Sequence, residues 1–179
     1  MNIKLKLFLF SILISLGSAS FAVDNGTWTY DVNSNGTSIT LTGCSGSCPK
    51  DLTIPATIDG YSTTIIGTYA FVDLQLTSVS IPDSVTAIDE RAFSFNSLST
   101  VIIPDSVVTI GAQAFRRSSD AAGDPLTTLT LGRSVKTIGE KAFWHNQLSR
   151  VIVPAGVITI GSSAFADNAL TLVRFLSNR

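Results

Sequence analysis

Apolar residues recur at a fixed interval along most of the chain. An Ala-Phe pair returns at spacings of 22, 22, 28 and 22 residues, and a leucine column and a valine column repeat the 22-residue spacing with the same six-residue insertion. The phenylalanines are Phe71, Phe93, Phe115, Phe143 and Phe165. Because one such unit encloses no interior, the pattern predicts about five stacked 22-residue repeats, with a sixth begun at Leu170.

Within one unit, the pattern predicts a strand followed by a turn. Val79 and Ile81 alternate with serines, which is the period of a half-buried strand, and Pro82 ends that strand. Ala92-Phe93 then predicts a short helical or 3₁₀ turn whose Phe fills the interior. A glycine precedes most of these turns and is expected to allow a positive φ. These glycines are Gly67, Gly111, Gly139 and Gly161.

Asparagine stands three residues after the phenylalanine in three units, at Asn96, Asn146 and Asn168. Leu74 and Ser118 hold the corresponding place in the first and third units. Stacking brings these amides into one column. Because an amide both donates and accepts hydrogen bonds, we expect the column to satisfy buried backbone groups at the turn.

The sequence Leu-Thr-Ser-Val-Ser-Ile-Pro that begins at Leu76, and the Ala-Phe that ends the same unit, recur in order in three further units. This pattern resembles the BspA-like leucine-rich repeats, from about Leu52 to the C-terminus. The resemblance implies a curved, mostly β solenoid of the α/β class. It also implies a secreted or surface-displayed protein that binds other proteins or host matrix. The chain departs from the pattern at Asp89, which replaces the glycine, and at Leu131-Gly132, which replaces Ile-Pro.

Residues 23–51 precede the repeats and are expected to form a capping hairpin with a disulfide loop. Apolar and polar residues alternate over 27–32 and 37–41, on either side of a turn. A solenoid needs its first coil covered, and aromatic residues such as Trp28 suit that role. The solenoid itself is expected to occupy 52–179.

The first 22 residues have the pattern of a signal peptide. Lys4 and Lys6 precede an apolar run over 7–16, and small residues stand before a cleavage point at Val23. A membrane anchor is the alternative, but this run is shorter than the roughly 20 residues that a span needs. The mature chain is therefore expected to have no transmembrane segment and to be secreted, periplasmic or displayed at the cell surface.

Two cysteines, Cys44 and Cys48, are separated by Ser-Gly-Ser. An oxidising compartment predicts a local disulfide between them. A redox-active pair is the alternative, although the spacing differs from the two-residue spacing of thioredoxin-type sites.

The charges argue against a nucleic-acid partner. The chain has 12 Lys and Arg against 13 Asp and Glu, and only 14% of its residues are charged. Its single histidine, His145, makes no metal site by itself, and no catalytic motif places a serine or carboxylate around it. We expect no enzymatic activity and no cofactor, with an enzyme of unrecognised site as the alternative.

The outward-facing residues of the repeated strands differ from repeat to repeat, whereas the inward leucine and valine columns recur. The outward residues are therefore the candidates for binding. We predict a face that binds another protein or an extracellular matrix component, with a merely solvated sheet as the alternative. Its residues are Thr100, Ile102, Thr128, Thr130, Arg150, Ile152, Leu172 and Arg174.

Three further features bear on binding. The insertion predicts an exposed loop that offers a second contact through Arg116, Arg117, Asp120 and Asp124. The outer edge of the sixth strand allows a homodimer through the C-terminal end of the stack. A Ser/Thr column suggests ice or crystal-surface binding as an alternative function. This column is Thr77, Ser99, Thr127, Ser149 and Thr171.

Overall fold

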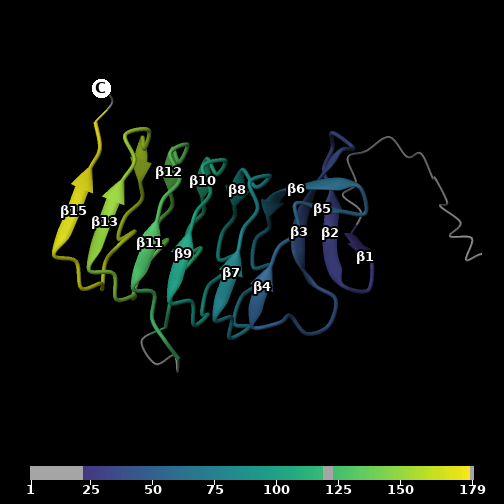
Figure 1. Cartoon of the computed structure of the whole chain (residues 1–179), viewed down its shortest axis with the longest axis horizontal. Coiled ribbons are helices and arrows are strands. Elements are labelled where there is room, and N and C mark those ends of the chain that lie inside the picture. Colours follow the sequence, from purple (N-terminus) through teal and green to yellow (C-terminus); the bar gives the residue numbers. More distant parts are fainter. Residues whose placement is uncertain (1–21, 119–122, 178–179) are drawn as a thin grey trace, which may run out of the picture.

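The computed structural model describes residues 22–118 and 123–177, and over these residues the chain winds into a solenoid of about six coils (Figure 1). Fifteen strands and no helix lie within the described residues. One column of strands stands in front in Figure 1, and a second column lies behind it. The prediction of a mostly β solenoid is confirmed.

The front column, called the strand face below, holds six strands, one from each coil. Parallel hydrogen bonding joins β4 to β7, β9 to β11 and β13 to β15, so the column consists of three two-stranded sheets. The strands are β4 (Asp51–Thr53), β7 (Ser78–Ser80), β9 (Thr100–Ile102), β11 (Thr128–Thr130), β13 (Arg150–Val153) and β15 (Leu172–Phe175). In β9 and β13 the central valines, Val101 and Val151, point into the core, and their neighbours point to solvent.

The rear column is one continuous parallel ladder from β6 to β14. Its strands are β6 (Tyr61–Ile66), β8 (Ala87–Ile88), β10 (Thr109–Ile110), β12 (Thr137–Ile138) and β14 (Thr159–Ile160). The short strand β5 (Thr57–Ile58) pairs with β6 in the antiparallel direction. Each rear strand from β8 to β14 contributes one isoleucine, and three of the four, Ile88, Ile110 and Ile138, are fully buried.

The N-terminal segment extends this rear ladder rather than forming a separate lid. β1 (Ala22–Asp24), β2 (Trp28–Val32) and β3 (Ser38–Cys44) pair in antiparallel order, and β3 then pairs in parallel with β6. The predicted hairpin is therefore present as β2–β3, and β1 adds a third strand to it.

The five phenylalanines lie in single file through the interior. Successive ring centroids, from Phe71 to Phe165, are 5.4, 5.2, 5.4 and 5.3 Å apart, and the rings are stacked within 16° of parallel. Trp28 of β2 meets Phe71 edge-on, with 6.5 Å between ring centroids. The file is thus covered at its N-terminal end by the cap.

The asparagine column forms as predicted. Asn96 Nδ2 donates to the carbonyl oxygens of Phe71 and Phe93, at 2.7 and 3.0 Å, while its Oδ1 accepts from the amide of Leu76 at 3.0 Å. Asn146 and Asn168 repeat this arrangement two and three coils further on. Each amide therefore joins two coils at backbone groups that have no strand partner.

The prediction of a helical or 3₁₀ turn around each Ala-Phe pair is wrong. Alternate amides of the turn donate to the next coil: Arg91 to Ala112 at 2.9 Å and Phe93 to Ala114 at 2.8 Å. The amides of Ala92 and Ser94, which alternate with these two, donate to Asp89 and Arg91 within the same turn. Because half of the amides are used between coils, a continuous helical ladder cannot form.

The reason proposed for the glycine column is also wrong. Gly111 and Gly139 do not have positive φ; that conformation falls two residues later, at Arg91, Gln113 and Lys141, with φ of 53 to 56°. The glycines are needed because the coils approach closely. A Cβ on Gly111 would lie 2.6 Å from the backbone carbon of Asp89 in the preceding coil.

The disulfide between Cys44 and Cys48 is present at the end of β3, with the two Cα atoms 5.5 Å apart. The leader predicted for 1–22 lies outside the described residues except for Ala22, which begins β1. Among the residues that are described, no helix is long and apolar enough to cross a membrane.

Candidate protein-binding face

The eight residues predicted for binding all lie on the strand face. They come from β9, β11, β13 and β15, and all point outward into solvent. Three of them are large apolar side chains with substantial exposure: Ile102 is 62% exposed, Ile152 39% and Leu172 45%. The strand alternation therefore positions these residues together, as expected from the repeat.

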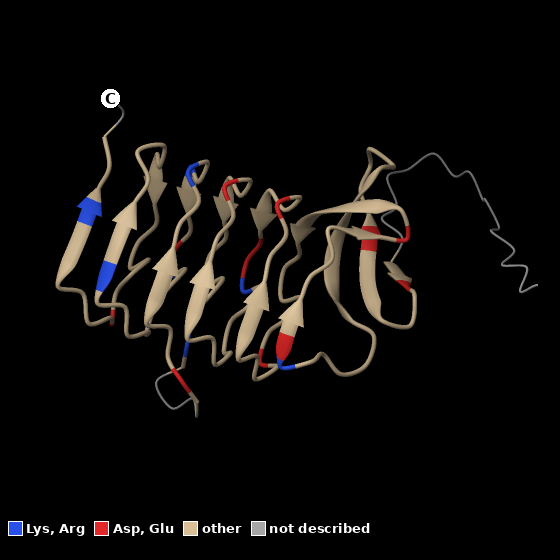
Figure 2. Cartoon of the chain, viewed as in Figure 1, with Lys and Arg blue, Asp and Glu red and all other residues tan. Residues whose placement is uncertain are grey.

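The last two strands of the face bring two arginines and two apolar residues into an alternating square. The register of β13 and β15 places Arg150 beside Leu172 and Ile152 beside Arg174. Figure 2 shows the two positive charges at opposite ends of β13 and β15. These four residues, called the C-terminal patch below, offer diagonal cations separated by apolar surface.

A groove of about 420 Å³ runs beside this patch, between β11 and β13. Thr128 and Thr130 line one wall, and Arg150 and Ile152 line the other. The two strands belong to separate two-stranded sheets, so the groove follows an interruption in the hydrogen-bonded ladder.

Arg133 closes one end of the groove and is held by Asp105. Its Nη2 lies 2.7 Å from Asp105 Oδ2, and its backbone amide donates to Oδ1 at 2.8 Å. The side-chain hydrogen bond from Arg133 lowers the pKa of the Asp105 carboxyl, and the same bond raises the pKa of the guanidinium. The pair therefore stays ionised near neutral pH.

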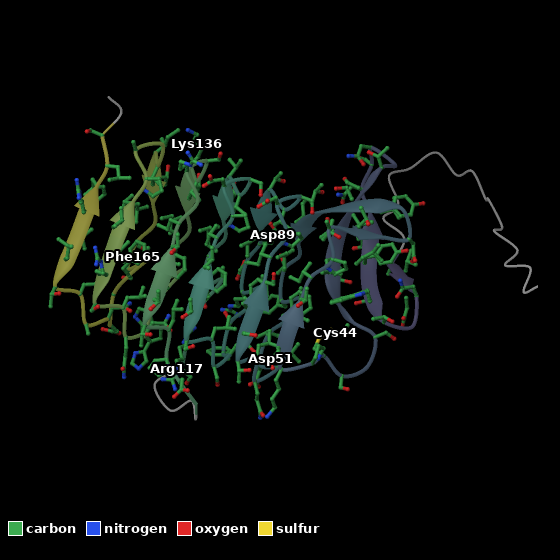
Figure 3. All side chains as sticks on the ribbon, in the orientation of Figure 1. Cys44, Asp51, Asp89, Arg117, Lys136 and Phe165 are labelled. Atoms are coloured by element: carbon green, nitrogen blue, oxygen red, sulfur yellow. A yellow bond between two sulfur atoms is a disulfide. The ribbon has the colours of Figure 1, made fainter. Side chains whose placement is uncertain are left out.

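The opposite end of the strand face carries a carboxylate that is engaged in hydrogen bonds within the protein. Asp51 of β4 accepts from Thr77 Oγ1 at 2.9 Å and from Ser78 Oγ at 3.0 Å. Figure 3 labels this residue at the lower end of β4. At the N-terminal end of the face, the carboxylate is thus already hydrogen-bonded within the protein, whereas the C-terminal end exposes arginine and apolar side chains.

The residues predicted around the insertion are not part of this face. Arg116 is half-buried at a coil corner, where its guanidinium lies 5.3 Å from the centroid of Phe95 and 4.7 Å from that of Trp144. Arg117 donates to the backbone carbonyl of Gly123. Asp124 lines a separate hollow, and Asp120 lies outside the described residues.

The Ser/Thr column lies beside the strands, and several of its hydroxyls are used within the protein. Thr127 Oγ1 donates to the carbonyl of Ser99 at 3.2 Å, and Thr171 Oγ1 donates to that of Ser149 at 3.1 Å. These bonds join consecutive coils, so they give the column a structural role.

A family model described as the BspA type leucine rich repeat region matches residues 37–171 in six copies. The chain belongs to this family. The BspA-type match starts at Thr37, just before β3, so the family pattern includes part of the hairpin that precedes Leu52.

Solved structures of bacterial leucine-rich repeat proteins share the BspA-type solenoid. A leucine-rich repeat protein from Bacteroides ovatus is 30% identical, with a TM-score of 0.69, over 86% of this chain and 40% of that one. The T. pallidum leucine rich repeat protein is 27% identical, with a TM-score of 0.69, over 84% of this chain and 70% of that one. A leucine rich cell surface protein from Faecalibacterium prausnitzii shares the fold, at 24% identity and a TM-score of 0.52, over 89% and 56% of the two chains.

This chain therefore spans about half or less of the length of two of these solved proteins. Among curated proteins, none matches it significantly.

The one histidine of this BspA-type chain lies at a coil corner. His145 Nδ1 is 3.7 Å from Asp167 Oδ2, and its ring centroid is 5.0 Å from that of Trp144. Among the described residues, no three His, Cys, Asp or Glu side chains form a group that could hold a metal ion.

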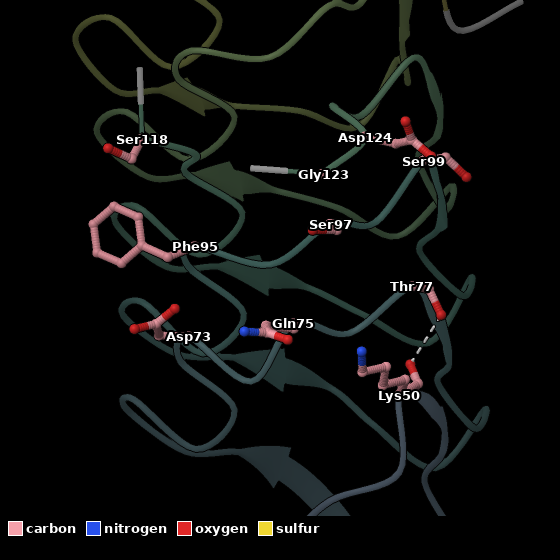
Figure 4. Close-up of a pocket in the computed structure, with 10 residues that line it drawn as sticks. All are labelled: Lys50, Asp73, Gln75, Thr77, Phe95, Ser97, Ser99, Ser118, Gly123 and Asp124. Carbon is pink, nitrogen blue, oxygen red and sulfur yellow. Dashed lines mark hydrogen bonds between the residues drawn. The ribbon is translucent and has the colours of Figure 1, made fainter. Parts of the chain in front are cut away.

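Sequence reasoning missed a larger hollow of about 740 Å³ at the lower edge of the first coils, called the polar hollow below (Figure 4). It lies where the chain passes from the coil corner to the strand face. Its lining residues are Lys50, Asp73, Gln75, Thr77, Phe95, Ser97, Ser99, Ser118, Gly123 and Asp124. Apart from Thr77 and Ser99 of the Ser/Thr column, these fall at positions where the repeats differ from one another, and that variation is the main signal of the hollow in the sequence.

Proposed function

We propose that the protein is a secreted or surface-exposed module that binds another protein or a matrix component through the strand face. The alternating square of the C-terminal patch carries this proposal, because it combines exposed apolar surface with arginine. Protein interfaces are enriched in that combination. The description of one structural neighbour as a cell surface protein agrees with an exposed location.

The charges of the patch define the partner's chemistry. Arg150 and Arg174 are exposed, and neither forms an ion pair with another described residue. A partner with two carboxylates flanking an apolar side chain matches this arrangement. Such a partner places its acidic groups on the arginine diagonal and its apolar group against Ile152 and Leu172.

The test measures binding of the purified protein to a panel of purified extracellular matrix and cell-surface proteins by biolayer interferometry. Wild-type protein is compared with the double variant Arg150→Glu/Arg174→Glu. Because both charges of the diagonal are reversed, we expect affinity to fall about a hundredfold, and binding by the wild type to weaken with added salt.

Lys136→Glu provides the matched control. Lys136 is exposed next to β12 in the rear column, away from the strand face (Figure 3), so its reversal changes net charge by the same amount per site. Equal binding by the wild type and the double variant would contradict the assignment of the strand face, as would an equal loss in the Lys136 control.

We also propose a homodimer through the C-terminal edge of the stack. Val173 of β15 is 46% exposed, whereas Val151, at the same position one coil earlier, is 1% exposed. Two copies that pair along β15 cover the Val173 side chain of each copy and the open backbone edge of the strand. Sedimentation equilibrium should show a concentration-dependent dimer that Val173→Arg abolishes, and wild-type protein that stays monomeric at high concentration would contradict it.

A further inference from the structure

We propose that the polar hollow binds a neutral oligosaccharide. At about 740 Å³ the hollow lies within the size range of small-molecule sites. It is open along one side, as a chain-like ligand requires, and its lining places hydrogen-bonding side chains next to an aromatic ring (Figure 4). The site is distinct from the strand face, so this inference does not rest on the proposed protein partner.

Three hydrogen-bonding side chains of the hollow are available for a ligand. Lys50, Asp73 and Gln75 are exposed, and their side chains make no hydrogen bond or ion pair to another described residue. Figure 4 shows Gln75 between Asp73 and Lys50. A carboxylate accepts from two adjacent hydroxyls, a carboxamide donates to one and accepts from another, and an ammonium donates to a third. This set matches the vicinal hydroxyls of a pyranose.

Phe95 supplies the apolar wall. Its ring is half-buried, and the Arg116 guanidinium lies 5.3 Å from the ring centroid, so the ring packs against a neighbouring side chain. An aromatic ring that is partly packed in this way loses less conformational entropy when it contacts the C–H groups of a sugar.

Backbone conformation also distinguishes this part of the stack. Gln75 has φ of 56°, and it follows Asp73 and precedes Phe95, whose φ values are 55° and 62°. The left-handed region is unfavourable for residues with a Cβ, and such residues gather at binding sites. Asp73 and Phe95 share this conformation with corners elsewhere in the stack, but Gln75 has no counterpart among the described residues at its position in the repeat.

The charges of the lining and the length of the hollow indicate which class of sugar it binds. The lining carries two carboxylates, of Asp73 and Asp124, and one ammonium, of Lys50, so the hollow disfavours an acidic glycan. The hollow crosses three coils, whose phenylalanine rings are spaced at 5.4 and 5.2 Å. Consecutive hexoses of an extended chain repeat at a comparable interval, so each coil can meet one sugar residue.

The test uses isothermal titration calorimetry of the purified protein with four neutral probes: cellotetraose, laminaritetraose, chitotetraose and maltotetraose. We expect at least one to bind, and trigalacturonate, as an acidic probe, to bind more weakly than that one. Asp73→Ala/Gln75→Ala removes two exposed side chains of the lining, and we expect it to weaken binding about tenfold or more.

Asp167→Ala is the matched control, because Asp167 occupies the same place as Asp73 in the last unit, with φ of 53°, and lies outside the hollow. Its affinity should equal that of the wild type. Absence of binding by all four neutral probes, stronger binding of trigalacturonate, or equal affinity in the Asp73→Ala/Gln75→Ala variant would overturn the proposal.

Discussion

Trp28 meets Phe71 edge-on, with 6.5 Å between ring centroids and an interplanar angle of 89°, at the N-terminal end of the phenylalanine file. Every later ring in the file lies flat against the next one. The edge-on ring therefore marks where the repeat ends and the cap begins. Each coil of a solenoid is stabilised by the coils on either side of it, so the first coil depends on this contact with the cap.

Trp28→Ala should lower the free energy of unfolding by about 2–4 kcal/mol, because it leaves the first ring of the file without a cover. Chemical denaturation measures the change. Thr42→Ala, at an exposed position of β3, serves as the control and should have a small effect. Equal stability of Trp28→Ala and the wild type would show that the first coil needs no cap.

Asn146→Ala should destabilise the protein by about 1–3 kcal/mol, since it leaves buried backbone groups of two coils without partners. Gln147→Ala, at the exposed neighbouring position, should leave the unfolding midpoint where it is. An unchanged midpoint in Asn146→Ala would count against the structural role of the column.

Gly111→Ala tests the close approach of the coils. The added Cβ would lie 2.6 Å from the backbone of Asp89 and Glu90, so the coils must separate locally, at a cost of about 1–3 kcal/mol. Asp83→Ala is the control, because Asp83 is exposed and already carries a Cβ. If both substitutions had the same small effect, steric contact would not explain the glycines.

Asp89→Asn should stabilise the protein at neutral pH. Burial raises the pKa of the Asp89 carboxyl, so its ionised form costs stability above that raised pKa, and the cost disappears as pH falls and the group is protonated. The gain in melting temperature over the wild type should therefore be present at pH 7 and shrink toward pH 3. Asp105→Asn should show no gain at pH 7, because the Arg133 hydrogen bond lowers the pKa of Asp105. A gain for Asp89→Asn that is independent of pH would contradict burial as the cause.

The repeat could be predicted from the sequence because its period is visible in the side chains themselves. The phenylalanine file and the asparagine column follow directly from the 22-residue repeat and its one six-residue insertion. The roles of Gly111 and of the turn at Phe93 could not be predicted in the same way, since both depend on how backbones of different coils approach and bond.

The same distinction, between what one repeat predicts and what depends on contacts between coils, holds for the candidate sites. Strand alternation placed Arg150 and Ile152 outward, but the square that they form with Leu172 and Arg174 depends on the register between β13 and β15. The polar hollow depends on three coils at once, and Lys50 lies ahead of the first full unit. Spacing within one unit contains no information about such a cavity.

Hydroxyl-radical footprinting of the complex with a partner from the binding panel tests the strand face most directly. Ile152 and Leu172 lie on the face, whereas Ile158, which is 81% exposed, lies just before β14 in the rear column and serves as an internal reference. The partner should reduce oxidation of Ile152 and Leu172 and leave that of Ile158 unchanged. Protection of Ile158 with unchanged oxidation of Ile152 and Leu172 would contradict binding through the strand face.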